Sequence, residues 1–468
     1  MTATFSQFRE RAVIAIEDVR LQEALDRGTD NFRKMRDQAV AEVPQFEDLR
    51  DHFKAIRSAT LAQLAHHLET FEQNAIAAGA HVYWARDGAE ACQIVIELAR
   101  EQGASVATKS KSMATEEIHL NEALAEAGVE AVETDLGEWI LQLAQEMPSH
   151  IIAPAIHKTT RQVAELFSEQ AGRPLPEDDI PALTAEARRI LRERFLEAGI
   201  GISGGNIMVA ETGSVVLVTN EGNGRLVTSA PPVHVAVIGI EKVTSTWDEA
   251  AVWLSLLARS AAGQPLSIYT SVITGPARAE DADGPEEVHI VLLDNGRSLQ
   301  VGTVYEEVLQ CIRCGACLNV CPVYREAGGH AYGSPYCGPI GAVVSPLLFG
   351  MESYSALPHA SSLCGACRDV CPVRIDLPRM LLELRKDEVG VLPWWERKAE
   401  EGAAFVLKHE KWMRFVTGVM RVAQRAFVRK GVLNLPDWLN PAAGRQLPHL
   451  AKRSFRKMWQ SGELEQKQ

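Results

Sequence analysis

Eight of the nine cysteines in this chain fall between positions 311 and 371. The first run reads Cys311-Ile-Arg-Cys314-Gly-Ala-Cys317-Leu-Asn-Val-Cys321-Pro322. This is the spacing C-x2-C-x2-C-x3-C-P of bacterial iron–sulfur proteins. Three thiolates on one tight loop can reach three irons of a cubane cluster, whereas the fourth lies beyond a helical turn and points toward a second cluster. The run therefore predicts two adjacent iron–sulfur clusters and a role in electron transfer.

A second run repeats the later part of the first, as Cys364-Gly-Ala-Cys367-Arg-Asp-Val-Cys371-Pro372. It lacks the leading cysteine, and Ser361 stands at that position. In two-cluster ferredoxins, the last cysteine of each run ligates the cluster of the other run. We therefore expect one cluster to be held by Cys311, Cys314, Cys317 and Cys371, and the other by Cys321, Cys364 and Cys367.

The second predicted cluster has only three cysteine ligands, and three candidates could complete it. Ser361 is in register but offers a harder and rarer ligand atom. Cys337, in the segment SPYCGPIG, is the spare thiol of the module. Water, or a cluster with three irons, is the third option. We rank Cys337 behind the incomplete-cluster options, because its glycine-flanked loop has the composition of a turn.

Zinc is the main alternative for a cysteine-rich segment. Structural zinc takes four thiolates, usually in two C-x2-C pairs. Three cysteines at x2 intervals with a fourth at x3 before proline do not fit that pattern. Cys92, beside Ile94 and Val95 on an apolar helical stretch, is expected to be a buried inert thiol. His150 and His157 lie seven residues apart, which is no metal-ligand spacing.

Composition places the chain among ordinary globular proteins. It has 468 residues, of which 46% are hydrophobic and 23% charged, so two or three domains are expected. The net charge of −13 argues against nucleic-acid binding. No signal peptide and no apolar run of membrane-spanning length is apparent. A cytoplasmic location is expected, and there clustered cysteines indicate metal ligands rather than disulfides.

The elements that must position these cysteines differ along the chain. Residues 1–75 have the composition and periodicity of helices. Residues 76–300 alternate short β-branched runs with helical segments, which predicts an α/β sheet with helices on both faces. Residues 301–390 change to cysteine-rich loops with short helices. The junction between these last two parts is only a few residues long, so we expect them to pack together.

The C-terminal region, residues 391–468, is basic and rich in tryptophan. From Lys408 to the end, Lys and Arg exceed Asp and Glu by nine, which leaves −22 for the rest of the chain. The segment FVTGVMRVAQRAFVRKGVL is predicted to be an amphipathic basic helix. This tail could dock a partner subunit, contact an anionic membrane surface, or pack on the acidic body of the protein. Because Trp and Arg are enriched at interfaces, a partner is favoured.

The α/β part holds weaker candidates for ligand binding. The glycine-rich loop at 201–206 could offer N–H groups to an anion, but it matches no phosphate or dinucleotide fingerprint and is better interpreted as a turn. Lys109 and Lys111 could hold a carboxylate or phosphate, although solvated lysines are commoner. Glu211 lies inside an apolar run, and a buried carboxylate there would need a partner.

The chain resembles lactate utilization protein B, a family of iron–sulfur subunits from a three-protein bacterial L-lactate oxidation system. The resemblance is carried by TKSKSMATEEIHLNEAL, ETDLGEWILQLA, PSHIIAPAIHK, GGNIMVAETGSVVLVTNEGNGR, SAPPVHVAVIGIEKV, CIRCGACLNVCPVY, YCGPIGAVVSPL and ASSLCGACRDVCPVRIDL. The cysteine motifs alone would fit many redox subunits. The ETDLGE segment and the SGGN and ETGS segments make the resemblance narrow, and it extends over nearly the whole chain.

The resemblance implies an α/β lactate-utilisation (LUD) domain, similar in fold to ribose-5-phosphate isomerase and CoA-transferase-like proteins. A helical two-cluster ferredoxin-type domain and the basic helical tail follow it. The family's ligands carry over to the seven cysteines already assigned. Serine at position 361 is usual in the family, and Cys337 is not one of its recognised ligands. No catalytic residue of the α/β domain can be carried over.

The expected function is electron transfer in the oxidation of L-lactate to pyruvate. Other subunits of the system would share the chemistry, because the chain has no flavin or nicotinamide fingerprint, and a quinone or another carrier would accept the electrons. Three alternatives remain: a self-sufficient lactate dehydrogenase that uses the clusters, a subunit of another 2-hydroxy-acid oxidase such as one for glycolate, and a redox sensor.

Overall fold

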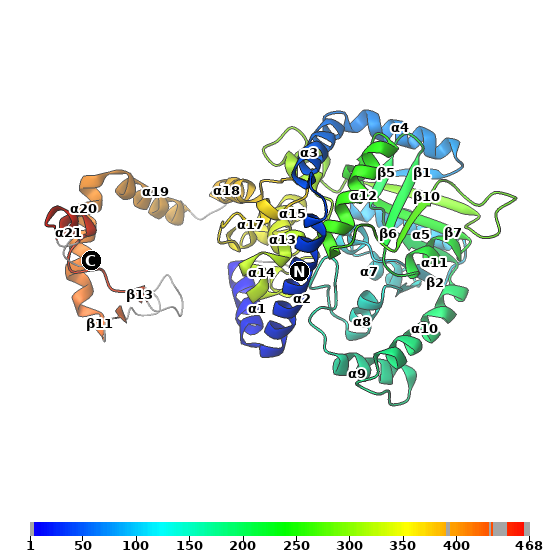
Figure 1. The fold of residues 1–468 in the computed structure, drawn as a ribbon, viewed down its shortest axis with the longest axis horizontal. Helices are drawn as coiled ribbons and strands as arrows, with labels where there is room; N and C mark the ends of the chain where they lie inside the picture. Colours follow the sequence, from blue (N-terminus) through cyan, green and yellow to red (C-terminus); the bar gives the residue numbers. More distant parts are fainter. Residues whose placement is uncertain (1–3, 390–393, 430–431, 434–446, 463–468) are drawn as a thin grey trace. The chain divides into compact units, whose positions relative to one another are not determined.

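A computed structural model of the protein describes residues 4–389, 394–429, 432–433 and 447–462 (Figure 1). The chain divides into two compact units, Met1–Glu388 and Val389–Gln468. The first unit contains both the α/β part and the cysteine-rich part. All the cysteines of the chain belong to it.

The first unit begins with four helices, where the sequence predicts a helical segment. Their bounds are α1 (Phe5–Glu17), α2 (Val19–Ala41), α3 (Phe46–Ala62) and α4 (Leu64–Ala77). Asp18 separates the first two, and its carboxylate accepts hydrogen bonds from the N–H groups of Arg20 and Leu21. α3 buries Phe53, Ile56 and other apolar side chains at helical spacing, so one face of the helix is committed to the core.

The main sheet has six strands in the order β1-β10-β7-β4-β2-β3, and every pairing is parallel. Their bounds are β1 (His81–Ala85), β2 (Val106–Lys109), β3 (Glu130–Glu133), β4 (Ile200–Ser203), β7 (Val233–Gly239) and β10 (Glu287–Leu293). Along β7, Val235 and Val237 face one core and Ala236 and Ile238 the other. Both faces are thus covered, as the near-continuous apolar runs predict.

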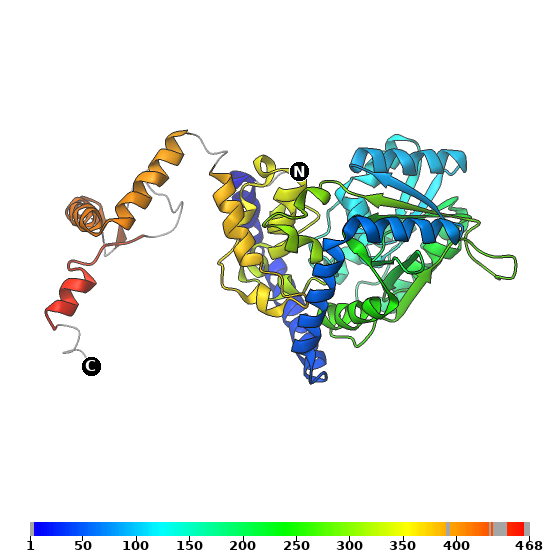
Figure 2. The same cartoon turned by 90° about the horizontal axis from the view of Figure 1, so that it is seen from above.

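Different layers cover the two faces of this sheet (Figure 2). One face packs against α5 (Gly88–Glu101) and α7 (Leu120–Glu126). The other shares a core with α4 and α12 (Trp247–Ala262) and with a second, four-stranded sheet in the order β8-β5-β6-β9. The second sheet comprises β5 (Ile207–Val209), β6 (Ser214–Thr219), β8 (Val243–Thr244) and β9 (Tyr269–Ile273). The sequence predicts helices on both faces of the sheet. Helices do cover both, but on one face a second sheet contributes to the same layer.

The apolar run at 205–220 is folded back on itself as the antiparallel pair β5 and β6. The turn contains Gly213 at φ +65°, where an added Cβ would lie 2.1 Å from the backbone nitrogen of Ala75. Only glycine can bring this turn against α4. The helical segment after β2 is divided into α6 (Met113–Glu117) and α7, because His119 has a left-handed backbone conformation.

Three further helices surround the β3 edge and share a core of their own. These are α8 (Leu136–Ala144), α9 (Thr160–Ala171) and α10 (Ile180–Glu197). α11 (Asn223–Ser229) packs near β4 and β7. The short apolar segment at 149–155, which lies between α8 and α9, forms an irregular loop rather than a strand.

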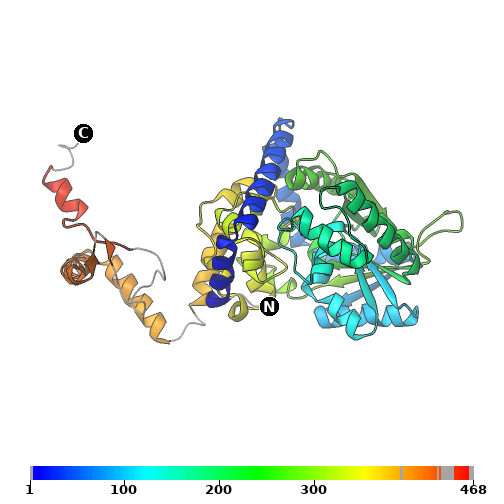
Figure 3. The same ribbon diagram turned by 90° about the horizontal axis from the view of Figure 1, so that it is seen from below.

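The cysteine-rich part consists of short helices joined by loops. These are η2 (Ser298–Gln300), η3 (Glu306–Gln310), α13 (Ala316–Asn319), α14 (Pro322–Ala327), η4 (His330–Tyr332), α15 (Gly338–Phe349), α16 (Met351–Tyr354), η5 (Leu357–His359), α17 (Ala366–Val370) and α18 (Leu377–Glu388). The blue N-terminal helices α1 and α2 lie against this yellow region (Figures 1 and 3). One continuous core joins it to the α/β part, so the two pack together.

The described residues of the second unit form helices and three very short strands. Its elements are α19 (Trp394–Lys408), α20 (Glu410–Ala423), η6 (Gln424–Ala426), β11 (Val428–Arg429), β12 (Val432–Leu433), β13 (Leu447–Pro448) and α21 (Phe455–Gln460). The helix predicted over the segment that starts at Phe415 ends at Ala423, and two of its last residues lie outside the described ones. Within the described ranges, no helix is both long and apolar enough to cross a bilayer.

Candidate functional site

The two cysteine loops have the same backbone conformation. Arg313 (φ +58°) precedes Cys314, and Gly315 (φ +75°) follows it. In the second loop Leu363 (φ +53°) and Gly365 (φ +86°) occupy the same positions on either side of Cys364. A short helix, α13 or α17, begins directly after each glycine. Left-handed residues at these positions curl the backbone so that its N–H groups can face an anionic cluster.

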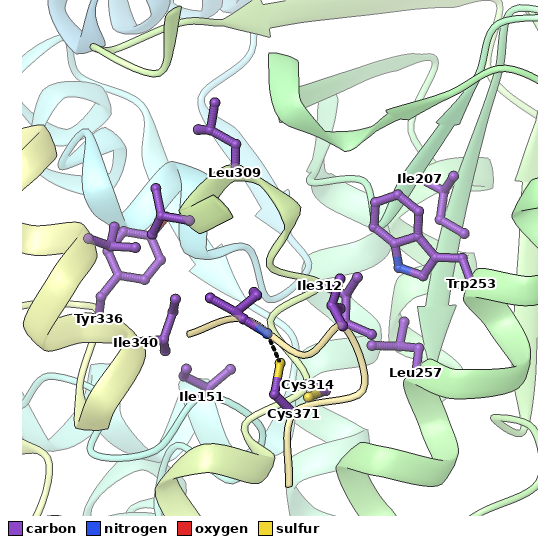
Figure 4. Packing of buried hydrophobic residues seen from close by; sticks show 14 of the residues in the cluster. Ile151, Ile207, Trp253, Leu257, Leu309, Ile312, Cys314, Tyr336, Ile340 and Cys371 are labelled. Carbon is purple, nitrogen blue, oxygen red and sulfur yellow. Dashed lines mark hydrogen bonds between the residues drawn. The ribbon is translucent and has the colours of Figure 1, made fainter. Parts of the chain in front are cut away.

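Four of the predicted ligands lie together in the first unit, two of them buried and two partly buried. They are Cys311, Cys314, Cys317 and Cys371. Burial raises the pKa of the Cys314 thiol to about 12, and the neighbouring Cys371 and Cys311 add to the rise. Figure 4 shows Cys314 and Cys371 among buried isoleucines. The second run thus contributes its last cysteine to the first loop.

The other three predicted ligands form a second group. Burial raises the pKa of the Cys367 thiol to about 12, and Cys321 and Cys364 raise it further. Cys364 is exposed, whereas Cys321 and Cys367 are buried. The two groups are adjacent, because Cys367 also contributes to the raised pKa of Cys317. The structure therefore brings the seven cysteines into two neighbouring groups of four and three.

The spacing of the sulfur atoms distinguishes a cubane cluster from zinc. Four thiolates around tetrahedral zinc would have sulfurs about 3.8 Å apart, given Zn–S bonds of about 2.3 Å. Among the described residues, which include every cysteine, no three sulfurs lie within 4.8 Å of one another. A cubane places its thiolates at the corners of a larger object, and the lack of a compact sulfur triad among the described cysteines agrees with such a cluster.

One group of side chains outside the cysteines has the compactness of a metal site. Ligand atoms of Glu146, His157 and His330 lie within 4.8 Å of one another. Hydrogen bonds already occupy them: His157 contacts Glu146 at 2.8 Å and Ser149 at 2.7 Å. The ammonium group of Lys158 also contacts Glu146, at 2.5 Å. We interpret this group as a polar link between the α/β part and the cysteine-rich part.

Ser361 and Cys337 lie in different surroundings. The Ser361 hydroxyl accepts a hydrogen bond from the N–H of Leu363 at 3.1 Å. The Cys311 sulfur accepts the equivalent bond from the N–H of Arg313 at 3.4 Å. Ser361 thus copies the position of the missing cysteine. Cys337 is 1% exposed, and its thiol donates to the carbonyl of Ser149 at 3.5 Å.

Arginines from the N-terminal helices hold the second run in place, and no sequence pattern indicates these contacts. Arg50 is 4% exposed and donates to the carbonyl oxygen of Cys371 at 2.6 and 3.0 Å and to that of Asp369 at 2.7 Å. Arg36 donates to the carbonyl of Val370 at 3.0 Å. These contacts satisfy the carbonyl groups at the end of α17, where a helix leaves them unpaired.

The end of β7 anchors the first loop through a buried charge network. Lys242 donates to the carbonyl of Cys311 at 2.8 Å. Arg297 is paired with Glu241 at 2.7 Å and with both oxygens of Glu117 at 2.7 and 2.8 Å. Burial opposes ionisation of Glu241, but Arg297, Lys242 and Arg313 outweigh it and lower its pKa to about 2. The carboxylate is therefore charged at neutral pH.

His150, which the sequence analysis treated as ordinary, braces the first loop from the other side. Its Nε2 lies 3.0 Å from the side-chain amide oxygen Oδ1 of Asn319 in α13, and its Nδ1 accepts from the N–H groups of Ile152 and Ala153. These partners require a neutral ring with the proton on Nε2. Burial lowers the pKa of His150 to about 4, in agreement with this state.

A cavity of about 420 Å³ adjoins the first cysteine group. Its wall includes residues that follow the carboxyl ends of β2, β3, β4, β7 and β10, which is where open parallel sheets bind ligands. The wall continues to Ile312, Arg313 and Cys314 on the first loop. The α/β part and the cysteine-rich part thus share one cavity.

Some of the weaker candidates from the sequence line this cavity and others do not. Lys111 lines it, and so do Gly204 and Gly205 of the glycine-rich loop. Lys109 does not line it; it is buried in an ion pair with Glu133 at 2.7 Å. Glu211 accepts a hydrogen bond from the N–H of Trp247 at 2.9 Å near the surface, away from the cavity wall.

Comparison with protein families gives two matches along the chain. The LUD domain family matches residues 68–293, and the 4Fe-4S dicluster domain family matches residues 307–375. A crystal structure of a DUF162 family protein from Deinococcus radiodurans covers 49% of this chain and 98% of its own. At 12% identity and a TM-score of 0.27, that likeness is too weak to indicate a shared fold.

Curated relatives match almost the whole length. Lactate utilization protein B of Bacillus velezensis is 47% identical over 383 residues, covering 82% of this chain and 80% of the relative. The protein of the same name from Bacillus pumilus is 44% identical over 471 aligned residues and covers 98% of each chain. The uncharacterized electron transport protein YkgF of Escherichia coli is 42% identical, covering 99% of this chain and 98% of its own.

Proposed function

This chain belongs to the lactate utilization protein B family, and we propose that it is the electron-transfer subunit of a system that oxidises L-lactate to pyruvate. The chain contains a 4Fe-4S dicluster domain and carries two iron–sulfur clusters. Bound clusters would supply one-electron carriers. Oxidation of one lactate releases two electrons and two protons, so two such carriers in series suit the reaction.

We assign the ligands from the two groups of cysteines. Cys311, Cys314, Cys317 and Cys371 would hold the first cluster, and Cys321, Cys364 and Cys367 the second. The grouping by mutual pKa effects and the wide spacing of the sulfurs support this assignment. Ser361, in register with Cys311, is the candidate for the fourth position of the second cluster.

The observation that carries the proposal is that one cysteine of each group lies in a different setting. Cys314 lies in the wall of the internal cavity, whereas Cys364 is exposed at the surface. Electrons that enter beside the cavity would therefore leave near Cys364. Other subunits of the lactate-oxidation system, and a quinone or another carrier as acceptor, would be the partners.

We propose the domain division 1–75, 76–300, 301–390 and 391–468, with a cytoplasmic location. The second part would share the fold of ribose-5-phosphate isomerase and CoA-transferase-like proteins, a suggestion supported by its parallel sheet. The basic last part would dock a partner subunit. Exposed Trp394, Trp395 and Trp412, together with the excess of nine positive charges from Lys408 onward, support that role. Binding of this part to anionic vesicles would instead favour a membrane surface.

A gene-deletion strain tests the proposal. Loss of growth on L-lactate, restored by the wild-type gene and not by the Cys314→Ser variant, is the expected result. Unchanged growth on L-lactate with lost growth on glycolate would assign the chain to a different 2-hydroxy-acid oxidase. Normal growth on both would contradict a role in either oxidation.

The cavity beside Cys314 also favours a second candidate, a self-sufficient lactate dehydrogenase. Anaerobically purified protein, given L-lactate and a dye acceptor, separates the two functions. Turnover without other subunits would support the dehydrogenase. The subunit proposal predicts no turnover until the other proteins of the system are added.

A further inference from the structure

The cavity beside the first cysteine loop has the features of a small-molecule site. Its volume of about 420 Å³ lies in the range of such sites. Apolar side chains, including Ile151, Ile152 and Leu257, form part of the wall, and charged side chains form the rest. An apolar wall with a few directed polar groups is the usual composition of a ligand pocket.

The cavity wall carries charges of both signs. Four cationic side chains, Lys111, Lys242, Arg297 and Arg313, and three carboxylates, Asp135, Glu221 and Glu241, line it. Glu117 and Glu138 lie next to two of these cations, Arg297 and Lys111, without lining the cavity themselves. The total charge therefore does not select a ligand, and recognition depends on which individual donors are still unpaired.

Two of the four cations already have strong partners. Arg297 is held by Glu117 and Glu241, and Lys242 donates to the carbonyl of Cys311. Their charges are committed to anchoring the first loop. A ligand in the cavity would have to use the remaining two cations.

Those two cations have unused donors. Arg313 stacks over the Tyr336 ring at 4.7 Å, and its Nη2 lies 3.9 Å from Glu241. Its Nη1 is buried and has no hydrogen-bond partner among the described residues. Lys111 Nζ is 3.2 Å from a Glu138 oxygen, yet within the described structure neither atom makes a hydrogen bond. Buried donors of this kind are costly unless a ligand or water pairs with them.

The repeated loop shows that its fold does not require Arg313. The equivalent residue of the second loop is Leu363, at φ +53° against +58° for Arg313. The same left-handed backbone thus accepts an aliphatic side chain. An arginine occurs in the loop that faces the cavity, and a leucine in the loop that leads to the surface. A need for charge at the cavity accounts for the difference.

We propose that this cavity binds a small monocarboxylate, with Arg313 and Lys111 as the groups that pair with its carboxylate. The inference rests on the proposed function, in which lactate and pyruvate are the acids present, and it adds their binding site on this chain. The ligand would lie against Cys314 and hence beside the first cluster. The apolar wall would contact its short carbon chain.

The test uses the full chain, purified anaerobically with its clusters. Sodium pyruvate and sodium L-lactate are titrated separately by calorimetry, with inorganic phosphate as the comparison anion. We expect one pyruvate or lactate per chain and weaker binding of phosphate. Each of Arg313→Leu and Lys111→Met should weaken carboxylate binding by about tenfold or more, as loss of a charge-assisted hydrogen bond predicts. The ligand should also shift the electron paramagnetic resonance of one cluster only.

Matched variants separate charge from structure. Arg313→Leu copies the residue of the second loop. Leu363→Arg makes the reverse change in the loop that does not line this cavity, and it should bind carboxylate like the wild type. If Arg313→Leu loses iron, Lys111→Met decides, since Lys111 lies outside the cysteine loops. Absence of carboxylate binding, tighter binding of phosphate, or wild-type binding by Lys111→Met would overturn the inference. If the inference is overturned but the wild-type protein holds both clusters and its gene supports growth on lactate, the proposed function stands and only the carboxylate site is refuted.

Discussion

The two cysteine loops have the same backbone conformation but contact different parts of the protein. The first has all its cysteines, is anchored by Lys242 and His150, and adjoins the internal cavity. The second has Ser361 in place of its leading cysteine and exposes Cys364. Since the local conformation is the same, the difference between the loops comes from the elements packed on them.

This comparison shows how a repeated motif can serve two ends of an electron path. Iron–sulfur potentials depend on burial, charge and hydrogen bonds to the sulfurs. The first group, beside the cavity, and the second group, which includes the exposed Cys364, should therefore differ in potential and in reactivity, even with the same loop conformation. Changes at matched positions of the two loops can test this.

The largest effect is expected from Cys314→Ser. Serine is a poor cluster ligand, so the first cluster should be lost and much of the second retained. Iron content should fall by about half, and the variant should fail to support growth on lactate. Metal analysis of the anaerobic protein checks this. Retention of full iron would place Cys314 outside the ligand set.

Arg50→Gln should loosen the second run without removing any ligand. Arg50 pairs with the carbonyl groups of Cys371 and Asp369, so we expect the free energy of unfolding to fall by about 2–4 kcal/mol. Arg33→Gln is the control, because Arg33 makes only an exposed pair with Asp30. Equal denaturant midpoints for the two variants would refute a bracing role for Arg50.

Mild acid should weaken the first unit through its buried histidines. Burial lowers the pKa of His150, His157 and His234 to about 4, below the unfolded value of about 6.5. The unfolded chain binds more protons between these values, so stability is present above pH 6.5 and is lost as the pH falls toward 4. Thermal midpoints measured from pH 7.5 to 5 should decline, and less steeply in His150→Gln. A flat profile for the wild type would contradict this.

Ser361→Cys should make the second loop more like the first. The added thiolate would complete a set of four with Cys321, Cys364 and Cys367. We expect a modest gain in the second cluster's resistance to oxygen, followed by the decay of its visible absorption in air. A faster decay than in the wild type would show that position 361 does not face the cluster.

The smallest effect is expected from Cys337→Ser. Cys337 is buried, and its thiol donates to the carbonyl of Ser149, a bond that serine can replace. Iron content should stay within error of the wild type. Loss of one cluster's iron would make Cys337 a ligand and displace Ser361.

The cysteine loops could be predicted because their geometry is local. Spacing within each run determines which sulfurs can bind the same cluster. The same spacing places Ser361 at the position that Cys311 has in the first run. The parallel sheet followed likewise from alternating apolar segments. Both kinds of prediction depend on residues that are close in sequence.

The anchors of these loops could not be predicted in the same way. Arg50 meets Cys371 across more than 300 residues, and Lys242 meets Cys311 across the junction of two folds. An arginine or lysine on an amphipathic segment carries no sign of such a distant partner. Lys109 and Lys111 are equal candidates in the sequence. Only the fold shows that Lys111 lines the cavity, whereas Lys109 is held in an ion pair with Glu133.

Metal analysis with electron paramagnetic resonance of the anaerobically purified protein tests the central claim most directly. The account predicts seven or about eight irons per chain with matching sulfide. It also predicts that the reduced protein shows resonance signals from two clusters, broadened by the magnetic coupling between them. Added oxidant should alter one of these signals more readily than the other. A colourless protein that holds zinc, or a single uncoupled cluster, would contradict the pair of unequal clusters proposed for this chain.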